Sequence, residues 1–240
     1  LAALPLIGAL AHPARCAPPP AIRAAHEDVN SAAVRERPGL QPNKNLLFNG
    51  WGVTPAGTHV RISDMALKMI VSPDRKMLVA VSGGFSDTGL TLLDLATRQV
   101  SQFLPLKECW NGVAFSRDGR RIFVPGGDTG LIHVFDYEEG KATPAAPVQP
   151  AADAVPVFLA GIAIHPATGK IYVCNEANHE VWVLNATTLG REATVATGQH
   201  PHSCLFGADK KHLYVTNWGS RAVSIIDADK NVRVRDVTVG

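Results

Sequence analysis

The side chains best suited to chemistry lie in one short segment, Gln199–Cys204. Within it His200, His202 and Cys204 follow one another at a spacing of two, which in a β-strand puts side chains on one face. Imidazole and thiolate groups are good ligands for zinc or copper. No second motif completes the set, so we expect no resident cofactor, with a transition metal at these three residues as the alternative. His200 also fits an ordinary connection that precedes a strand.

A second group of side chains could bind a ligand. Polar and aromatic residues recur where we expect connections between repeated units and loops between second and third strands: Asp87, Trp110, Asn111, Asp128, Glu176, His179, His202, Trp218 and Arg221. Such segments gather at one end of a scaffold and commonly form its ligand site. These residues therefore predict a binding site at the mouth of a channel. In the competing interpretation each side chain, Trp110 and Trp218 above all, packs between structural units.

Common catalytic motifs are missing from the sequence. It contains no GxSxG nucleophile elbow, no HExxH zinc motif, no GxGxxG dinucleotide motif and no GxxxxGK phosphate-binding loop. We therefore expect this stretch to have no catalytic residues and to act as a binding scaffold for a small molecule or a protein.

The elements that position these residues are repeats. Four stretches share one order of turn, strand, loop and further strand, and they end at Asp94, Asp136, Asn185 and Asp227. The intervals between these residues are 42, 49 and 42, close to the roughly 40–45 residues of one four-stranded propeller blade. The sequence therefore predicts an all-β chain, a β-propeller with blades at about 58–106, 107–155, 156–198 and 199–240.

Local chemistry explains the repeated residues without an active site. The acid or amide at the end of each third strand can accept backbone N–H bonds two residues on, which starts a turn. Turns such as Ser72–Arg75 and Ser116–Gly119 precede the second strands. Third strands such as Val181–Leu184 are apolar on both faces, which is expected when each sheet is covered by two neighbouring blades.

Two repeats contain a recognisable signature. Tyr214–Asn217 reads Tyr-Val-Thr-Asn, and Tyr172–Asn175 differs from it at one position. Phe123–Gly126 and Leu78–Val81 match it more loosely. Over about residues 50–240 the chain resembles the YVTN-repeat β-propellers of the bacterial YncE-like group.

The resemblance implies a ring of seven blades, of which this chain holds four. Gly50–Gly57 and the apolar N-terminus are similar to a subgroup in which an exported propeller precedes a C-terminal alkaline-phosphatase-like phosphoesterase domain. Val237–Gly240 stops within a connection between blades. We therefore expect a fragment of a longer protein.

Composition sets limits on location and partners. The chain has 240 residues, 46% of them hydrophobic, and a net charge of +2, too small to indicate nucleic acid or a membrane surface. Apolar residues 1–11 predict a signal-peptide remnant at 1–25, followed by a polar linker at 26–45 and the partial propeller at 46–240. We expect a periplasmic or secreted protein with no membrane span. Of the four cysteines, removal of a signal peptide before Cys16 leaves Cys109, Cys174 and Cys204, which we expect to be small buried thiols in strands. Export would permit one disulfide, and the spacing of the cysteines does not assign it.

Three functions are compatible with the sequence. The first is an exported propeller that binds a ligand or a protein partner, with a phosphoesterase domain in cis. The second is a metal or redox propeller resembling nitrous oxide reductase or a haem d1 domain, which needs histidines from several blades. The third is binding of single-stranded nucleic acid, which requires a basic groove with aromatic residues. The basic pairs Arg120–Arg121 and Lys210–Lys211 instead lie in turns opposite the expected mouth, so nucleic acid is the least expected partner.

Overall fold

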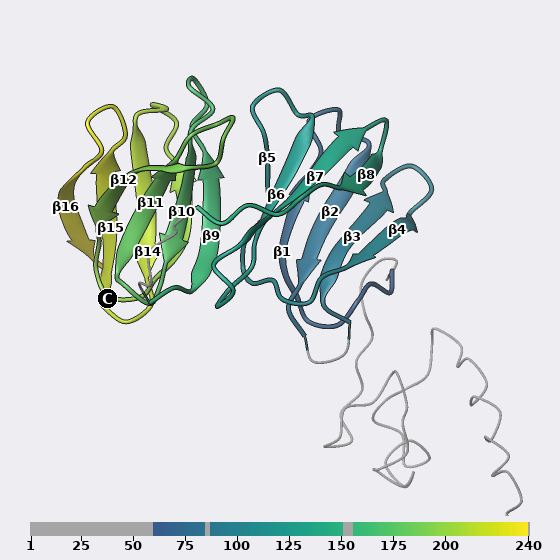
Figure 1. Ribbon diagram of the computed structural model, residues 1–240, viewed down its shortest axis with the longest axis horizontal. Coiled ribbons are helices and arrows are strands. Elements are labelled where there is room, and N and C mark those ends of the chain that lie inside the picture. Colours follow the sequence, from purple (N-terminus) through teal and green to yellow (C-terminus); the bar gives the residue numbers. More distant parts are fainter. Residues whose placement is uncertain (1–59, 85–86, 151–155, 240) are drawn as a thin grey trace, which may run out of the picture. The chain divides into compact units, whose positions relative to one another are not determined.

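The computed structural model describes residues 60–84, 87–150 and 156–239, and every regular element in these ranges is a β-strand. The strands form four antiparallel sheets of four strands each, here named blades A to D (Figure 1). The predicted all-β architecture of propeller blades is therefore confirmed. The predicted signal remnant at 1–25, the linker at 26–45 and the stretch Gly50–Gly57 lie outside the described residues.

Each blade is built from strands that are consecutive in the sequence. Blade A consists of β1 (Ala66–Val71), β2 (Met77–Ser82), β3 (Gly89–Asp94) and β4 (Gln99–Pro105). Blade B consists of β5 (Ala114–Phe115), β6 (Arg121–Pro125), β7 (Ile132–Glu138) and β8 (Lys141–Pro144). Blade C consists of β9 (Leu159–Ile164), β10 (Ile171–Asn175), β11 (Glu180–Leu184) and β12 (Arg191–Ala196). Blade D consists of β13 (Pro201–Phe206), β14 (His212–Asn217), β15 (Ala222–Asp227) and β16 (Val232–Thr238).

The turns after the third strands confirm most of the predicted local chemistry. Asp94 Oδ1 accepts the backbone N–H groups of Ala96 and Thr97 at 2.9 and 2.7 Å. Asn185 and Asp227 make the same pair of bonds in blades C and D. Because these bonds favour the charged carboxylate, they hold the pKa values of Asp94 and Asp227 below the ordinary value for aspartate.

The turn prediction for Asp136 is wrong. Strand β7 continues through Asp136 to Glu138, and the chain reverses at Glu139 and Gly140, which have φ angles of 48° and 81°. Glu138 pairs directly with Lys141, so the connection is a two-residue hairpin turn of the kind that needs positive φ at both positions. The glycine moves the reversal two residues along the chain, and Asp136 stays in the sheet.

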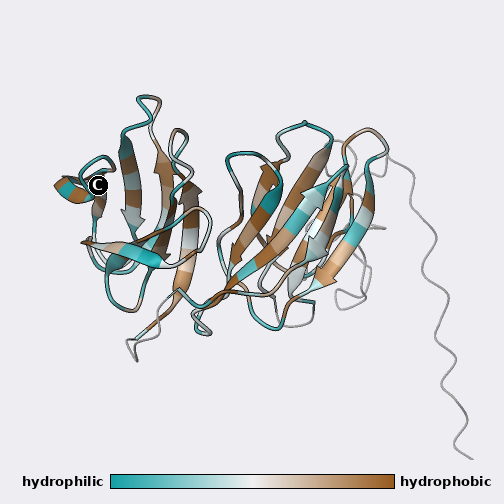
Figure 2. Ribbon diagram, turned by 45° about the horizontal axis from the view of Figure 1, so that its top comes forward, coloured by the Kyte–Doolittle hydropathy of each residue, from teal (hydrophilic) through white to brown (hydrophobic). Residues whose placement is uncertain are grey.

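Apolar side chains on both faces of the blades form the core. Three buried clusters lie between blades A and B, B and C, and C and D. Hydrophobic segments, interrupted by polar ones, recur in the strands of the blades (Figure 2). In β11, Trp182 and Leu184 belong to the cluster shared with blade B, whereas Val181 and Val183 belong to the one shared with blade D. Blade C is thus covered on both faces, as its apolar third strand predicted.

Blades C and D approach each other most closely at their first strands. A Cβ atom added to Gly161 of β9 would lie 2.6 Å from Ser203 Cα and 2.7 Å from the carbonyl oxygen of His202 in β13. Both distances are far below a normal van der Waals contact, so any side chain at this position would have to displace β13. The approach brings the beginning of β13 against blade C.

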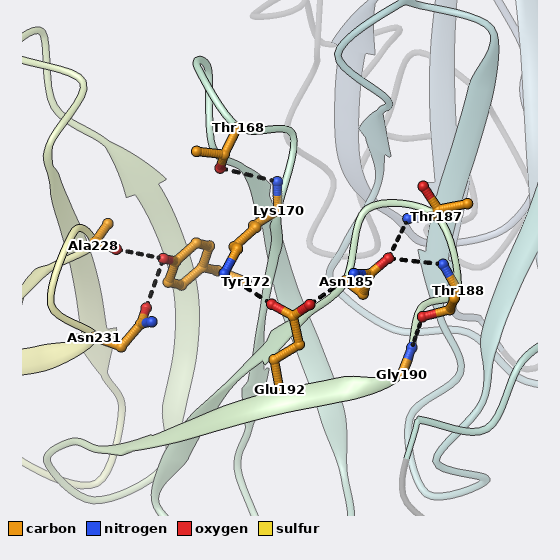
Figure 3. A network of polar contacts seen from close by, with 10 residues as sticks. All are labelled: Thr168, Lys170, Tyr172, Asn185, Thr187, Thr188, Gly190, Glu192, Ala228 and Asn231. Atoms are coloured by element: carbon orange, nitrogen blue, oxygen red, sulfur yellow. Dashed lines mark hydrogen bonds and ion pairs between the residues drawn. The ribbon is translucent and has the colours of Figure 1, made fainter.

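A tyrosine joins the same two blades farther from their first strands. The Tyr172 hydroxyl lies 3.1 Å from the Ala228 carbonyl oxygen and 2.8 Å from Asn231 Oδ1 (Figure 3). Burial raises the Tyr172 pKa to about 12, so the hydroxyl keeps its proton. Beside it the Lys170–Glu192 ion pair, with 2.8 Å between Nζ and Oε2, links the turn before β10 to β12 within blade C (Figure 3).

The buried asparagines of the signature tie strand ends together. The Asn217 side-chain nitrogen donates to the Ala222 carbonyl oxygen and to Ser224 Oγ, at 3.0 Å each. Asn175 Oδ1 accepts the backbone N–H of Phe158 at 2.9 Å. These bonds fix the loops that follow β14 and precede β9.

In blade A the signature match is displaced by one residue. Ser82 pairs with Gly89 at the first position of the third strand, as Asn217 pairs with Ala222 in blade D, so Ser82 is the residue equivalent to Asn217. The tetrapeptide equivalent to the signature is therefore the one that ends at Ser82, not Leu78–Val81. A serine in place of the asparagine explains why the sequence comparison misaligned this repeat.

Candidate functional site

One end of the blades carries all of the predicted ligand-binding residues. In each antiparallel blade the start of the first strand and the loop between second and third strands lie at the same end, here called the site end. The predicted residues occupy these segments: Trp110 and Asn111 before β5, His202 at the start of β13, and Asp87, Asp128, Glu176, His179, Trp218 and Arg221 in the second-to-third-strand loops. The topology thus gathers them as the sequence analysis expected, although position alone does not make them a binding site.

The centre of the site end is His202. Its Nδ1 lies 2.5 Å from Glu176 Oε1, and its Nε2 lies 2.8 Å from Asn111 Nδ2. Because an amide nitrogen can only donate, Nε2 is the acceptor and Nδ1 carries the proton that Glu176 accepts. Asn111, Glu176 and His202 come from blades B, C and D respectively, so we name them the three-blade cluster.

An exposed aromatic ring lies beside the three-blade cluster. The Trp218 indole packs edge-on against the His202 imidazole, with ring centroids 4.8 Å apart. The Trp218 residue is nevertheless 70% exposed, which is unusual for so large an apolar side chain. Its backbone N–H donates to the His200 carbonyl oxygen at 2.7 Å, so the loop that carries it is anchored to the start of blade D.

The second histidine pair is separate from the cluster. The His179 and His200 rings pack edge to face, with centroids 4.7 Å apart. The His200 backbone N–H donates to His179 Nδ1 at 3.1 Å, and both residues adopt positive φ, 56° and 52°. The pair connects the β10–β11 loop to the segment before β13 and stiffens the rim of the site end.

The three predicted metal ligands do not share one face. His200 precedes β13, and a register shift between Pro201 and Ser203 interrupts the alternation on which the prediction depended. His202 belongs to the three-blade cluster, whereas Cys204 is buried between blades C and D. Within the described residues no group of three histidine, cysteine or acidic side chains is arranged to hold a metal ion.

Two residues that the sequence did not single out, Glu108 and His133, also lie at this end of blade B. Glu108 shares a hydrogen bond with Asp128, which together with desolvation raises the Glu108 pKa. His133 Nε2 lies 2.9 Å from the Glu108 carbonyl oxygen, and burial lowers the His133 pKa, so the neutral ring donates to the carbonyl. Trp110 packs against Phe158, with ring centroids 5.6 Å apart. Glu108 stands in the same connection as Asn111, so its position was the available signal.

Two predicted residues stay apart from these groups. Asp87 and Arg221 are exposed, and within the described residues no hydrogen bond or ion pair joins either to the three-blade cluster. A groove of about 380 Å³ opens at the opposite end between blades B and C, beside Arg117, Arg121 and Thr168. The site end is defined here by its polar contacts.

Comparison with known proteins identifies one family. A family profile described as "SMP-30/Gluconolactonase/LRE-like region" matches residues 28–219. No curated protein sequence matches the chain at a significant level.

Solved structures resemble the chain in fold. A putative 6-phosphogluconolactonase from Bacteroides uniformis has 18% identity and a TM-score of 0.62, covering 81% of this chain and 64% of its own. Pseudomonas aeruginosa periplasmic gluconolactonase has 19% identity and a TM-score of 0.55, covering 73% and 54%. Kuenenia stuttgartiensis hydrazine synthase has 19% identity and a TM-score of 0.62, covering 77% and 52%. At such identities the likeness shows the fold alone, and the chain spans about half to two thirds of these neighbours.

Proposed function

The chain belongs to the SMP-30/gluconolactonase/LRE-like family, and from this premise we propose that its site end binds a small polyhydroxylated ring. We propose further that the complete protein hydrolyses a sugar lactone there. This differs from the expectation of a scaffold without catalytic residues, because the family name and two lactonase-titled neighbours favour hydrolysis.

The observation that carries the proposal is the three-blade cluster. A side chain from each of three successive blades meets at His202, and residues from separate blades converge in this way only near the centre of a propeller. The cluster offers the donors and acceptors that hydroxyl groups need. The exposed Trp218 indole beside it supplies an apolar surface for a ring.

The chemistry available to the cluster is proton transfer. Glu176 orients the His202 ring through Nδ1 and leaves the lone pair on Nε2, as in other pairs of base and orienting carboxylate. A water molecule that replaces the Asn111 amide at Nε2 would lose its proton to His202 while it attacks the lactone carbonyl carbon. The bond between the carbonyl carbon and the ring oxygen of the resulting tetrahedral intermediate then breaks. His202 returns the proton to the departing ring oxygen, and the hydroxy acid is the product.

The charge of the site end favours a neutral ligand. Glu176 belongs to the cluster, and the Glu108–Asp128 pair occupies the same end in blade B. A phosphorylated or carboxylate-bearing sugar would be repelled by these acids, since Lys107 offsets the charge of Glu108 only in part and Arg221 is set apart from the cluster. The favoured class is therefore an unphosphorylated sugar lactone.

Hydrolysis of D-glucono-1,5-lactone in a pH-stat, corrected for the spontaneous reaction, tests the proposal. Wild-type protein is expected to accelerate hydrolysis, and Glu176→Gln and His202→Ala to lower the rate by about 100-fold or more, the usual contribution of a positioned base. Asp118→Asn, in a turn at the opposite end, is the matched control and keeps the wild-type rate. A rate equal to the spontaneous one in wild-type protein contradicts the proposed hydrolysis.

Location and partners remain part of the proposal. The described residues include no helix able to cross a bilayer. Export is supported by the apolar residues 1–11, and one of the structural neighbours is titled periplasmic. The closer identity as a YVTN-type propeller, the downstream phosphoesterase domain, a protein partner and the redox or nucleic-acid alternatives stay predictions.

A further inference from the structure

We propose that Cys174 and Cys204 form a disulfide bond that fastens blade C to blade D. Cys174 lies in β10 and Cys204 in β13, so the bond would join two sheets that otherwise meet only through noncovalent contacts. The proposal concerns a modification site and does not depend on the proposed lactone hydrolysis.

The two thiols are reduced and lie in the same interface between the blades. Cys204 Sγ donates to the Tyr172 carbonyl oxygen of β10 at 3.8 Å, two residues before Cys174 in the same strand, and the neighbouring Cys204 thiol helps to raise the Cys174 pKa. Both residues belong to the buried cluster between blades C and D. A register shift between Val173 and Asn175 places an irregularity at Cys174, and such bulges re-aim side chains.

The third described cysteine provides the contrast. Cys109 is buried between blades A and B, where it donates to the Ser82 carbonyl oxygen at 3.1 Å. Among the described residues, the interblade cluster that contains Cys109 holds no other cysteine. Cys174 and Cys204 thus share one interblade cluster, whereas Cys109 lies in a different one.

The oxidation is a thiol–disulfide exchange with a small-molecule disulfide such as oxidised glutathione. One cysteine thiolate attacks a sulfur of the reagent, forms a mixed disulfide and expels one glutathione thiolate. The other cysteine thiolate then attacks the protein-bound sulfur of that mixed disulfide and expels the second. The two electrons lost by the cysteines reduce the disulfide bond of oxidised glutathione, and the two protons are taken up by the glutathione thiolates that leave.

The timing of the reaction follows from burial. Cys174 is fully buried, and both its thiol neighbour and its burial raise its pKa, so little attacking thiolate exists in the folded protein. The bond is therefore expected to form during folding, before blade D covers blade C, and to resist reductants afterwards.

Peptide mapping of the full chain tests the disulfide. The chain is refolded with oxidised glutathione, free thiols are alkylated, and the protein is digested with trypsin without reduction. Mass spectrometry is expected to find the peptide Ile171–Arg191 joined to Glu192–Lys210, with Cys109 alkylated in Glu108–Arg117. Alkylated cysteine in both of the first two peptides, or a link from either to another cysteine, overturns the proposal.

Thermal unfolding supplies a second readout. Oxidised wild-type protein is expected to melt about 5–10 °C above the reduced form, because the bond constrains the unfolded chain. Cys109→Ser is the matched control and keeps this difference, whereas Cys174→Ser abolishes it. Equal melting temperatures of oxidised and reduced wild-type protein contradict an interblade fastening. If Cys174→Ser fails to fold, the wild-type peptide map still decides.

Discussion

Replacement of Gly161 by alanine tests whether blades C and D meet as closely as described. The new Cβ atom would lie 2.6 Å from Ser203 Cα, 2.7 Å from the His202 carbonyl oxygen and 3.1 Å from the Cys204 backbone nitrogen. All three atoms belong to the backbone of β13, so no side chain can turn away. The strand must retreat by about 0.8 Å to restore an ordinary contact, an overpacking that costs about 1–3 kcal/mol.

A smaller entropic effect opposes this cost. Alanine loses less backbone entropy than glycine when a strand forms, which stabilises the folded variant by about 0.5–1 kcal/mol. We therefore expect Gly161→Ala to lower the free energy of unfolding by about 1–2 kcal/mol, measured by urea denaturation followed by circular dichroism. Because the displaced segment includes His202, the hydrolysis rate is expected to fall as well.

Gly190→Ala is the matched control. A Cβ atom at Gly190 would meet Thr188 Oγ1 at 3.5 Å, which is an ordinary contact, so stability should be unchanged or slightly higher. The close packing of blades C and D is refuted if the two variants unfold at the same urea concentration.

Three further predictions concern individual side chains. Hydrogen bonds from His212 and from the neighbouring backbone lower the Asp209 pKa to about 2. The ionised Asp209 carboxylate therefore stabilises the fold above its ordinary pKa near 4, and this stabilisation is lost as the pH falls toward 2. Asp209→Asn should accordingly weaken the dependence of the melting temperature on pH in this range. The Glu108 pKa is raised, so the stabilising contribution of the protonated Glu108 carboxyl is lost as the pH rises. Glu108→Gln should therefore melt no lower than wild type at pH 7, and a lower melting temperature would contradict the carboxyl pair with Asp128. Tyr172→Phe removes the hydroxyl beside Ala228 and Asn231 and should cost about 1 kcal/mol in urea denaturation, whereas an unchanged midpoint would show that this contact contributes nothing.

Local features of the fold could be predicted from the sequence because their causes are local. The turns at Asp94, Asn185 and Asp227 depend on side chains that bond backbone groups two and three residues away. Asp136 escaped the same rule because a glycine at position 140 favours a tight hairpin, and that glycine was visible in the sequence.

The centre of the site could be predicted only in part. The sequence singled out Asn111, Glu176 and His202 one by one. Their mutual contacts join three blades and depend on the angle between neighbouring sheets, which the sequence does not give. A bulge at the start of β13, which no residue type announces, interrupts the spacing of two on which the metal alternative depended. Glu108 and Phe158 gain their partners from packing between blades and from loop geometry, which sequence spacing does not encode.

Amide chemical-shift mapping tests the proposed ligand site most directly. The full chain, labelled with ¹⁵N and deuterium, is titrated with D-glucono-1,5-lactam, a neutral ring that lacks the hydrolysable ester. Shifts are expected at the site end, around Asn111, Glu176, His202 and Trp218, and should disappear in Trp218→Ala. Saturable shifts confined to the opposite end, around Arg117 and Thr168, or no saturable shifts at all, would contradict a ligand site at the three-blade cluster.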